Sequence, residues 1–340
     1  MESSEQSYKI NILQQLGKVL ASKNNEDNEV YLYAKAKNPW FTIDFIQAAF
    51  DALQEAFLNK EQLEKWLSNY PLNNTTSKKV GLIVAGNIPL VGLHDIICAY
   101  FSNHQILLKL SSKDDVLMNY FMNEWALLDP TVNTQFTISE SLKNIDAIIA
   151  TGSNTTHQYF EYYFKNIPKI LRKNRNSISV LQGNESAEEL TALADDICMY
   201  FGLGCRNVSC LFVPKDFDIT KLFPHFEKYS YMKNHVKYMN NYDYNRTLLL
   251  MNSIPHLSND YIILQESLEL SSRLAVVHYN YYSSIEELNQ FIETHQEEIQ
   301  CVVSGQKGLQ CATVNYGESQ RPSLSQYADN IDTLQFLINL

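Results

Sequence analysis

The sequence predicts an α/β protein built on parallel β-sheets, and three observations lead to that prediction. From residue 80 onward, short apolar runs alternate with amphipathic stretches of helical periodicity. Most of these runs end in small or polar residues, as expected where a strand gives way to a turn and a helix. No internal repeat or low-complexity tract interrupts the alternation, which is typical of βαβ units.

Residues 1–78 are predicted to form a helical segment that packs on the domain after it. Apolar residues recur at helical spacing in three stretches, 10–20, 42–58 and 60–66. Pro71 then ends the pattern. This segment carries no pattern that indicates chemistry.

Residues 79–183 are predicted to form a dinucleotide-binding domain with a Rossmann-type parallel sheet. Its expected strands occupy residues 80–86, 106–110, 134–138, 145–153 and 178–183. Ligands of such sheets bind where the strands end. The polar residues and glycines at these ends are therefore candidate binding residues: Asn87, Lys109, Ser111, Ser112, Lys113, Gly152, Ser153, Gln182 and Gly183.

Residues 184–325 are predicted to form a second α/β domain, followed by a C-terminal segment at 326–340. A capping box of Ser186 and Glu189 begins a helix that ends at Gly202. Further strands are expected at 208–213, 261–264, 274–279 and 301–305.

Cys205 stands out within this second domain. It follows Gly202 and Gly204, which permit tight turns, and it precedes an apolar strand. A thiol on a turn between a helix and a strand can be presented to a substrate. The alternative is that Cys205 is a small buried hydrophobe, as free cysteines often are; the chain has 6 cysteines.

Composition excludes several classes of function. A hydrophobic fraction of 45% and a charged fraction of 19% are those of a folded protein. The net charge of −11 argues against a nucleic-acid-binding protein. No apolar run is long enough for a membrane span, and the first residues do not resemble a secretory signal, so a cytoplasmic protein is expected. The absence of a CxxC pair disfavours a zinc site and a disulfide framework, and no metal is expected.

Each candidate at a strand end also has a structural interpretation. The Asn87 amide can donate to an oxygen that gains negative charge, or it can simply form a turn before Pro89. Lys109 and the serines after it can hold a ribose or phosphate, or form a solvated turn. Gly152 can offer its amide to a phosphate, although its surroundings are not GxGxxG. His94 and Asp95, adjacent on a predicted helix, point in different directions and are expected to be structural.

In their order along the chain, these segments resemble the aldehyde dehydrogenase superfamily, and more closely its acyl-CoA reductase (LuxC-type) family. The similar segments are VGLIVAGNIPLVGLHD, ILLKLSSKD, IIATGS, FGLGCRNVSCLFVP, Gln265-Glu266-Ser267 and residues 316–337. The likeness covers residues 79–337. It implies an aldehyde-dehydrogenase-like fold with a cofactor domain and an α/β catalytic domain.

The resemblance implies a role for each matched residue. Cys205 would be the nucleophile, and Asn87 with the Cys205 backbone N–H would form the oxyanion hole. Lys109 would contact the adenosine ribose, Gly152 and Ser153 the pyrophosphate, and Glu266 the nicotinamide ribose.

Two departures from the superfamily pattern refine this expectation. Members that hydrolyse their acyl-enzyme place a general base, a Glu, before a Leu-Gly-Gly. The matching stretch here begins with Val180 instead. Without a general base at that position, transfer of the acyl group to or from CoA is favoured over hydrolysis. Members that prefer NAD place a Glu three residues after the strand-end lysine, where this chain has Ser112 and then Lys113. A 2′-phosphate is accepted there, so NADPH is the expected cofactor, with NADH as the alternative.

The expected activity is NADPH-dependent reduction of a long-chain acyl-CoA to the aldehyde through an S-acyl-Cys205 intermediate. Two other enzymes remain open: a CoA-acylating aldehyde dehydrogenase, and an acyl-phosphate reductase, for which Arg206 is the only adjacent phosphate-binding candidate. A non-catalytic acyl-binding or scaffolding subunit is the alternative from another class. Family likeness further suggests an acyl-CoA or acyl-carrier substrate, and either self-association or an acyl-transferring partner.

Overall fold

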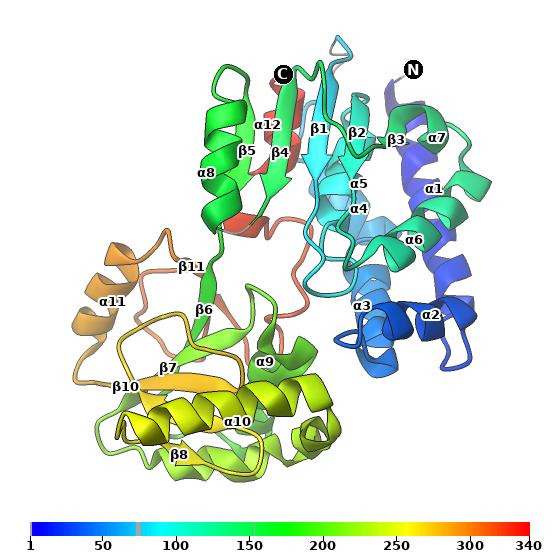
Figure 1. Cartoon of the computed structure of the whole chain (residues 1–340). Coiled ribbons are helices and arrows are strands. Elements are labelled where there is room, and N and C mark those ends of the chain that lie inside the picture. The colour runs from blue at the N-terminus through cyan, green and yellow to red at the C-terminus, as the bar shows by residue number, and fades with distance from the viewer. Residues whose placement is uncertain (1, 73–75, 153) are drawn as a thin grey trace. The chain divides into compact units, whose positions relative to one another are not determined.

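The computed structural model describes residues 2–72, 76–152 and 154–340, which form two compact units (Figure 1). Unit 1 comprises Met1–Asn174 and Arg321–Leu340, and unit 2 comprises Arg175–Gln320. The boundary after the first sheet therefore lies at 174, where the sequence analysis placed it at 183. The reason is that the strand expected at 178–183 pairs within the second sheet.

Unit 1 is built on sheet A, whose strands are all parallel and lie in the order β3-β2-β1-β4-β5. The strands are β1 (Lys79–Ile83), β2 (Gln105–Lys109), β3 (Phe136–Ile138), β4 (Ala147–Thr151) and β5 (Lys169–Arg172). This order is that of a Rossmann half, in which the chain changes direction across the sheet between β1 and β4. The sequence analysis missed β5, because only four residues with a charge at each end give little apolar pattern.

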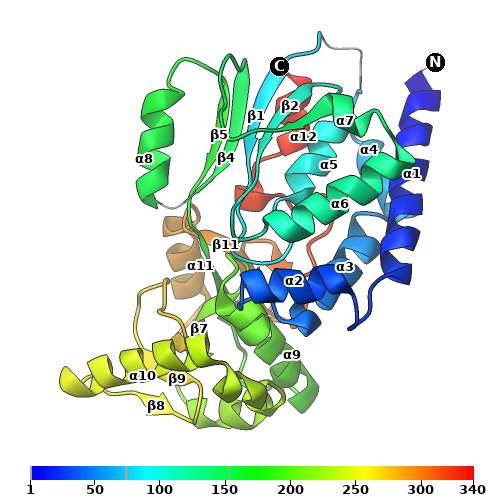
Figure 2. The ribbon, with the colours of Figure 1, turned by 45° about the vertical axis from the view of Figure 1, so that its right-hand side comes forward.

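Helices surround sheet A and continue into the N-terminal segment. They are α1 (Glu2–Ser22), α2 (Glu29–Lys37), α3 (Ile43–Ala56), α4 (Lys60–Leu67), α5 (Leu93–Phe101), α6 (Asp115–Leu128), α7 (Val132–Gln135), α8 (Asn154–Tyr163) and α12 (Thr333–Ile338). The caps Asn28, Thr42 and Asn59 each accept a hydrogen bond from the first turn of their helix. In Figure 2, α8 lies on one side of sheet A and α5 and α6 lie on the other, as expected when the chain reverses its direction across the sheet.

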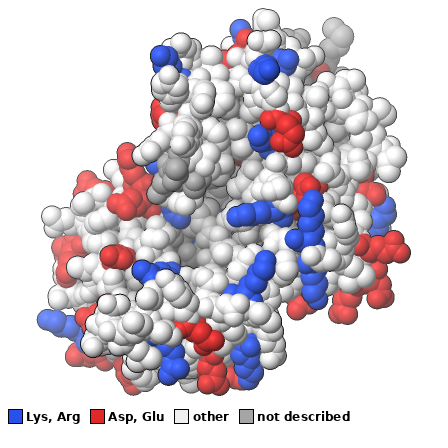
Figure 3. Space-filling model, in the orientation of Figure 1, with Lys and Arg blue, Asp and Glu red and all other residues white. Residues whose placement is uncertain are grey.

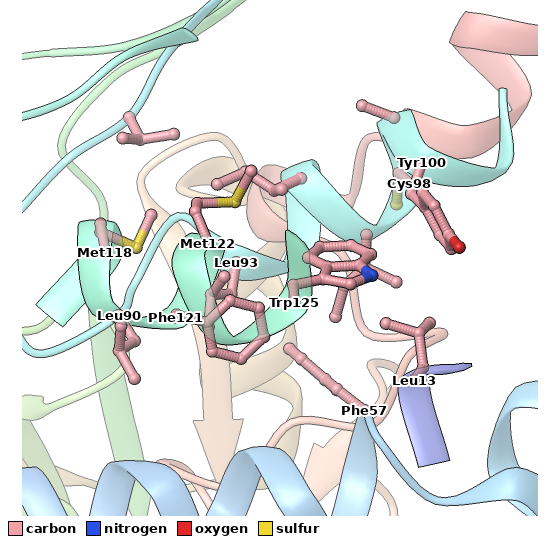
Figure 4. Packing of buried hydrophobic residues seen from close by; sticks show 14 of the residues in the cluster. Leu13, Phe57, Leu90, Leu93, Cys98, Tyr100, Met118, Phe121, Met122 and Trp125 are labelled. Carbon is pink, nitrogen blue, oxygen red and sulfur yellow. The ribbon is translucent and has the colours of Figure 1, made fainter. Parts of the chain in front are cut away.

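The N-terminal helices share one hydrophobic core with sheet A. Figure 4 shows Trp125 of α6 near its centre, with Leu13 of α1 and Tyr100 of α5 close by. The Trp125 ring meets Tyr100 edge-on at 4.6 Å between centroids and Phe121 at 5.8 Å. Truncating a buried aromatic of this kind typically costs about 3–5 kcal/mol.

The C-terminal segment joins unit 1 through buried polar contacts. The guanidinium of Arg172, at the end of β5, forms an ion pair with Asp95 of α5 and donates to Thr333 Oγ1 of α12 over 2.7 Å. His94 Nε2 donates to the Leu324 carbonyl over 3.0 Å, and the His94 ring stacks on Tyr327. His94 and Asp95 thus make structural contacts within unit 1, as the sequence analysis expected.

Unit 2 is built on sheet B, in the order β12-β11-β6-β7-β10-β9-β8. The strands are β6 (Asn176–Val180), β7 (Val208–Pro214), β8 (Leu257–Ser258), β9 (Ile263–Glu266), β10 (Val276–Tyr282), β11 (Ile299–Val303) and β12 (Thr313–Val314). All pairs are parallel except β8 with β9. The main helical elements are α9 (Ala187–Cys198), η1 (Met199–Gly202), η2 (Ile219–Asn234), α10 (Val236–Met251) and α11 (Ile285–Thr294).

The structure confirms the predicted α/β class, with a parallel sheet in unit 1, a mixed and mostly parallel sheet in unit 2, and a helical N-terminal segment. Among the described residues, no helix is long and apolar enough to cross a membrane. Figure 3 shows acidic and basic side chains interspersed on the face that it draws.

Candidate active site

Cys205 lies in a tight turn between η1 and β7. The turn begins with three consecutive left-handed residues, Tyr200 (φ 54°), Phe201 (φ 57°) and Gly202 (φ 72°). Only the glycine adopts this conformation without cost, so the two buried aromatic residues must be held in it by their packing. Cys205 itself is half-buried.

Asn207 fixes this turn, and sequence reasoning did not identify it. Its side chain Oδ1 accepts from the Gly204 N–H over 2.8 Å, and its Nδ2 donates to the Met199 carbonyl over 2.9 Å and the Asp196 carbonyl over 3.1 Å. One buried amide thus joins the end of α9, η1 and the backbone beside Cys205. Ser177 of β6 adds a hydrogen bond from its Oγ to the Cys205 carbonyl over 3.0 Å.

The other five cysteines are poorly suited to nucleophilic chemistry. Burial raises the pKa of each of their thiols: Cys98, Cys198, Cys210, Cys301 and Cys311. A thiol with a raised pKa is seldom ionised near neutral pH, and the thiolate is the reactive form. These five thiols are therefore weaker candidates for the nucleophile.

The three candidate residues of unit 2 do not come together at one edge of sheet B. Cys205 precedes β7 and so lies at its amino end, whereas Gly183 lies against the other end, where an added Cβ would stand 3.2 Å from Pro214 Cγ. Seven strand residues separate these ends by about 20 Å. Glu266 is exposed at the carboxyl end of β9, where it pairs with Tyr279 of β10. Tyr279 in turn pairs with Leu211 of β7, so Glu266 lies level with the middle of β7 and not with either of its ends. Gly183 belongs to unit 2, not to unit 1, which the sequence analysis predicts to bind a dinucleotide.

This placement also corrects the reasoning about a general base. Val180 ends β6 on the side away from Cys205, so its identity does not decide whether water is activated there. The residues beside the Cys205 turn are those at the amino end of β6, where Ser177 contacts the turn and the Asn176 N–H donates to the carbonyl of Glu298 over 2.8 Å. Glu185, an acid that follows Val180 in the sequence, lies at the edge of sheet B opposite to Cys205. There its carboxylate accepts hydrogen bonds from the backbone N–H groups of Gln182 and Gly183.

A cavity of about 240 Å³ opens at the same edge of sheet B as the Cys205 turn. The backbone of residues 202–204 forms one wall, and the loop 272–275 before β10 forms another. Sequence reasoning gave no signal for this cavity, because its walls come from several separate segments between residues 176 and 277.

In unit 1, most candidates lie together at the carboxyl edge of sheet A. Asn87 follows β1, and Gly86 before it packs closely on the loop after β2: an added Cβ would lie 2.7 Å from Ser111 Cβ. Asp114 links the same two loops, because its Oδ2 accepts from the Leu90 N–H over 2.6 Å. Burial raises the pKa of the Asp114 carboxyl well above its usual range.

Lys109 ends β2 and extends toward the loop after β3. Its Nζ lies 3.2 Å from the Glu140 carbonyl and 3.7 Å from the Glu140 carboxylate. Ser112 and Lys113 are exposed, and Ser111 is half-buried. Beyond β2, the Lys113 carbonyl accepts from Asn38 Nδ2 over 3.0 Å, so the N-terminal segment supports this loop.

Gly152 follows β4, the strand that pairs with β1. Its backbone N–H is directed to the Arg172 carbonyl over 3.4 Å. Ser153 lies outside the described residues. The structure thus brings Asn87, Lys109, the 111–113 loop and Gly152 to one edge of one sheet.

Comparison with known proteins gives two findings. The model of the acyl-CoA reductase (LuxC) family matches residues 18–222. No curated protein sequence matches the chain.

Solved structures of aldehyde dehydrogenases are similar in fold. Aldehyde dehydrogenase 21 from Physcomitrella patens, solved with its product succinate, has a TM-score of 0.68 and 10% identity, over 98% of this chain and 84% of that one. An acetylating aldehyde dehydrogenase from Geobacillus thermoglucosidasius has a TM-score of 0.63 and 10% identity, over 94% and 85%. The Mycobacterium tuberculosis aldehyde dehydrogenase complexed with NAD+ has a TM-score of 0.60 and 10% identity, over 88% and 73%. These similarities confirm the aldehyde-dehydrogenase-like fold.

Proposed function

Because the chain belongs to the LuxC family of acyl-CoA reductases, we propose that it reduces a fatty acyl-CoA thioester to the aldehyde with NADPH, through an S-acyl intermediate on Cys205. The observation that carries this proposal is the Cys205 turn. It holds a half-buried thiol on a backbone fixed by Asn207, while burial raises the pKa of the other thiols. The aldehyde dehydrogenase fold supports the same reaction class.

In the first step, the Cys205 thiolate attacks the thioester carbonyl carbon. A new S–C bond forms, the bond from carbon to the CoA sulfur breaks, and CoA leaves as a thiol after taking a proton. The Cys205 backbone N–H is the proposed donor to the oxyanion, and the Asn87 amide remains the second candidate named from the sequence.

The residues at the carboxyl edge of sheet A fit a dinucleotide. Lys109, Ser111, Ser112 and Lys113 supply cationic and hydroxyl donors without a carboxylate on the loop surface, which suits a ribose with a 2′-phosphate. Gly152 lies beside β1, at the point where strand order reverses and such sheets bind nucleotides. When bound there, NADPH would supply a hydride to the acyl carbon, and the bond from that carbon to Cys205 Sγ would break, which releases the aldehyde and regenerates the thiolate. Glu266 remains a candidate for the nicotinamide ribose.

An acyl-phosphate reductase remains the alternative. Arg206, the cation next to the thiol, donates one of its five N–H groups, at Nε, to the Ser319 carbonyl.

The test combines acyl-CoA-dependent NADPH consumption with the intact mass of the protein. We expect wild type to consume NADPH and to form an acyl adduct when NADPH is omitted. Cys205→Ala should form no adduct and lose at least about a thousandfold in rate. Cys301→Ala is the matched control, since Cys301 Sγ lies 3.1 Å from the same Ser177 hydroxyl that binds the Cys205 carbonyl. A Cys205→Ala enzyme that still forms the adduct, or a wild type that consumes neither NADPH nor NADH, contradicts the proposal.

A further inference from the structure

We propose that the outer face of α10 is a contact surface for a second copy of this chain, and that the two copies pack their α10 helices antiparallel about a two-fold axis. This proposal goes beyond the proposed reaction and does not depend on it. In Figure 1, α10 lies at the front of unit 2.

The inner face of α10 is anchored to unit 2. Its buried side chains recur every three or four positions and so lie on one side of the helix: Tyr238, Tyr242, Asn245 and Leu249. Tyr238 donates its hydroxyl to the Tyr261 carbonyl over 2.9 Å, and Asn245 donates its Nδ2 to the Leu274 carbonyl over 2.9 Å. These contacts fix the rotation of the helix, and therefore also which side chains lie on its opposite face.

The opposite face of α10 carries an exposed stripe without charge. Its residues also recur every three or four positions: Val236, Asn240, Tyr244, Thr247 and Met251. The three large apolar side chains among them, Val236, Tyr244 and Met251, are 73%, 61% and 77% exposed. Leu250, at 59%, adds apolar surface at the C-terminal end of the helix. Exposed apolar side chains that line up in this way, instead of lying singly, are typical of a contact surface.

Two charges beside the stripe point to a second copy as the partner. Asp243 and Arg246 are exposed, and they lie on the same side of the stripe because they are three residues apart. Within the part of the chain that the structure describes, neither forms an ion pair. If two α10 helices pack antiparallel about an axis between residues 244 and 245, Asp243 of each copy lies opposite Arg246 of the other. One surface thus supplies both charges, which favours a second copy over an unrelated partner.

The same axis gives the two helices almost complete overlap. It passes near the middle of α10, which spans Val236–Met251. Tyr244 of each copy then lies at the axis, and Met251 of each copy reaches the stripe of the other near Val236. One pair of helices of this length buries less surface than a standard interface, so we expect a dissociation constant in the micromolar range.

Charge exchange between the two positions tests this packing. Asp243→Arg leaves only positive charge at the two positions, and Arg246→Asp leaves only negative charge. Each variant alone should raise the dissociation constant of the dimer at least about tenfold, measured by sedimentation equilibrium. The double variant restores opposite charges across the axis and should return to within about threefold of wild type. An equimolar mixture of the two single variants should form a heterodimer for the same reason.

A second variant tests the stripe, with a matched control. Met251→Glu places a charge in the apolar contact and should raise the dissociation constant at least about tenfold. Leu127→Glu makes the same change at a side chain of α6 in unit 1 that is 78% exposed, and it should stay within about twofold of wild type. An unchanged circular dichroism spectrum and Tm show that each variant is folded.

Three results would overturn the proposal. The first is a wild type that stays monomeric at every concentration up to its solubility limit. The second is a dimer that neither Met251→Glu nor the single charge variants weaken, because it would use another surface. The third is a failure of both the double variant and the mixture to restore association, which would exclude the antiparallel pairing. None of these measurements uses catalysis, so a failure of the proposed reaction leaves them unaffected.

Discussion

The two sheets of this protein place their candidate residues at opposite strand ends. In sheet A, Asn87, Lys109 and Gly152 lie at the carboxyl ends of β1, β2 and β4. In sheet B, Cys205 lies at the amino end of β7, together with the cavity at its turn. Both sheets are parallel around these strands, so the apolar pattern of the strands does not show at which strand end the candidate residues lie.

This difference shows where the rule that ligands bind at the carboxyl ends of parallel strands applies. Ligands gather at the carboxyl ends of strands in a doubly wound sheet, because the connecting loops diverge where strand order reverses. Sheet A has such a reversal between β1 and β4. In unit 2, the proposed nucleophile instead lies on a turn that enters a strand, and the Asn207 side chain fixes this turn.

The largest effect is expected from the buried ion pair that holds unit 1 together. Arg172→Met leaves Asp95 buried without its cation and also removes the bond to Thr333. We expect unit 1 to lose about 3–5 kcal/mol of unfolding free energy. The measurement is urea unfolding followed by tryptophan fluorescence, which reports unit 1 alone because Trp40, Trp66 and Trp125 all lie there.

The control for this prediction is Arg321→Met in the same unit. Arg321 pairs with Glu55 at 3.2 Å, but both side chains are more than half exposed. Solvent screens such a pair, so the change should be within about 0.5 kcal/mol. Equal losses for the two variants would show that burial is not what makes the Arg172 contact strong.

The next effect tests whether the edge of sheet A takes part in the chemistry. Asn87→Ala removes the proposed oxyanion donor, and kcat for acyl-CoA reduction should fall about 100- to 1,000-fold with little change in KM. Asn133→Ala, on an exposed position of α7, should match wild type. If Asn87→Ala keeps full activity while Cys205→Ala does not, the catalytic groups are confined to unit 2.

Much of the fold followed from periodicity and strand-end residues, but some of it could not. The strand at 176–180 was expected, yet its sheet was misassigned, because an apolar run does not state which partner it pairs with. The β5 strand was missed because four residues carry too little pattern.

Some residues of the candidate site could likewise be identified from the sequence, and others could not. Cys205 and Asn87 stand beside glycine and proline, which mark turns in any sequence. Asn207, Ser177 and the cavity depend on contacts between separate elements, and no local pattern reports those. Gly183 matched a motif locally, but its strand runs in unit 2, away from Cys205.

Acid is expected to affect the two units in opposite directions. Burial lowers the pKa of His94 in unit 1 to about 4, so the unfolded state takes up the proton first and unit 1 loses stability as pH falls from about 6.5 toward 4. Burial raises the pKa of Asp196 in unit 2 to about 6, against the hydrogen bonds from the Gly317 and Ser319 N–H groups. Unit 2 therefore gains stability as pH falls from about 6 toward 4. Each contribution is on the order of 2–3 kcal/mol.

Hydrogen–deuterium exchange across this pH window measures the two units separately. His94→Gln should remove part of the acid loss in unit 1 only, and Asp196→Asn should remove the acid gain in unit 2 only. The prediction fails if either variant leaves the pH dependence of its own unit unchanged.

The smallest effect concerns the coenzyme, and it tests the carboxyl edge of sheet A directly. Ser112 is exposed three residues after Lys109, and Ser112→Glu places a carboxylate where we propose a 2′-phosphate binds. Repulsion should lower kcat/KM for NADPH about 10- to 100-fold, while the value for NADH stays level or rises because a carboxylate can accept from the ribose 2′-hydroxyl. Ser141→Glu, exposed after β3, adds the same charge to a neighbouring loop and should leave the preference unchanged. Equal losses with both coenzymes would mean that Ser112 is near the nucleotide but not its 2′ position, and no change with either would place the nucleotide away from this loop.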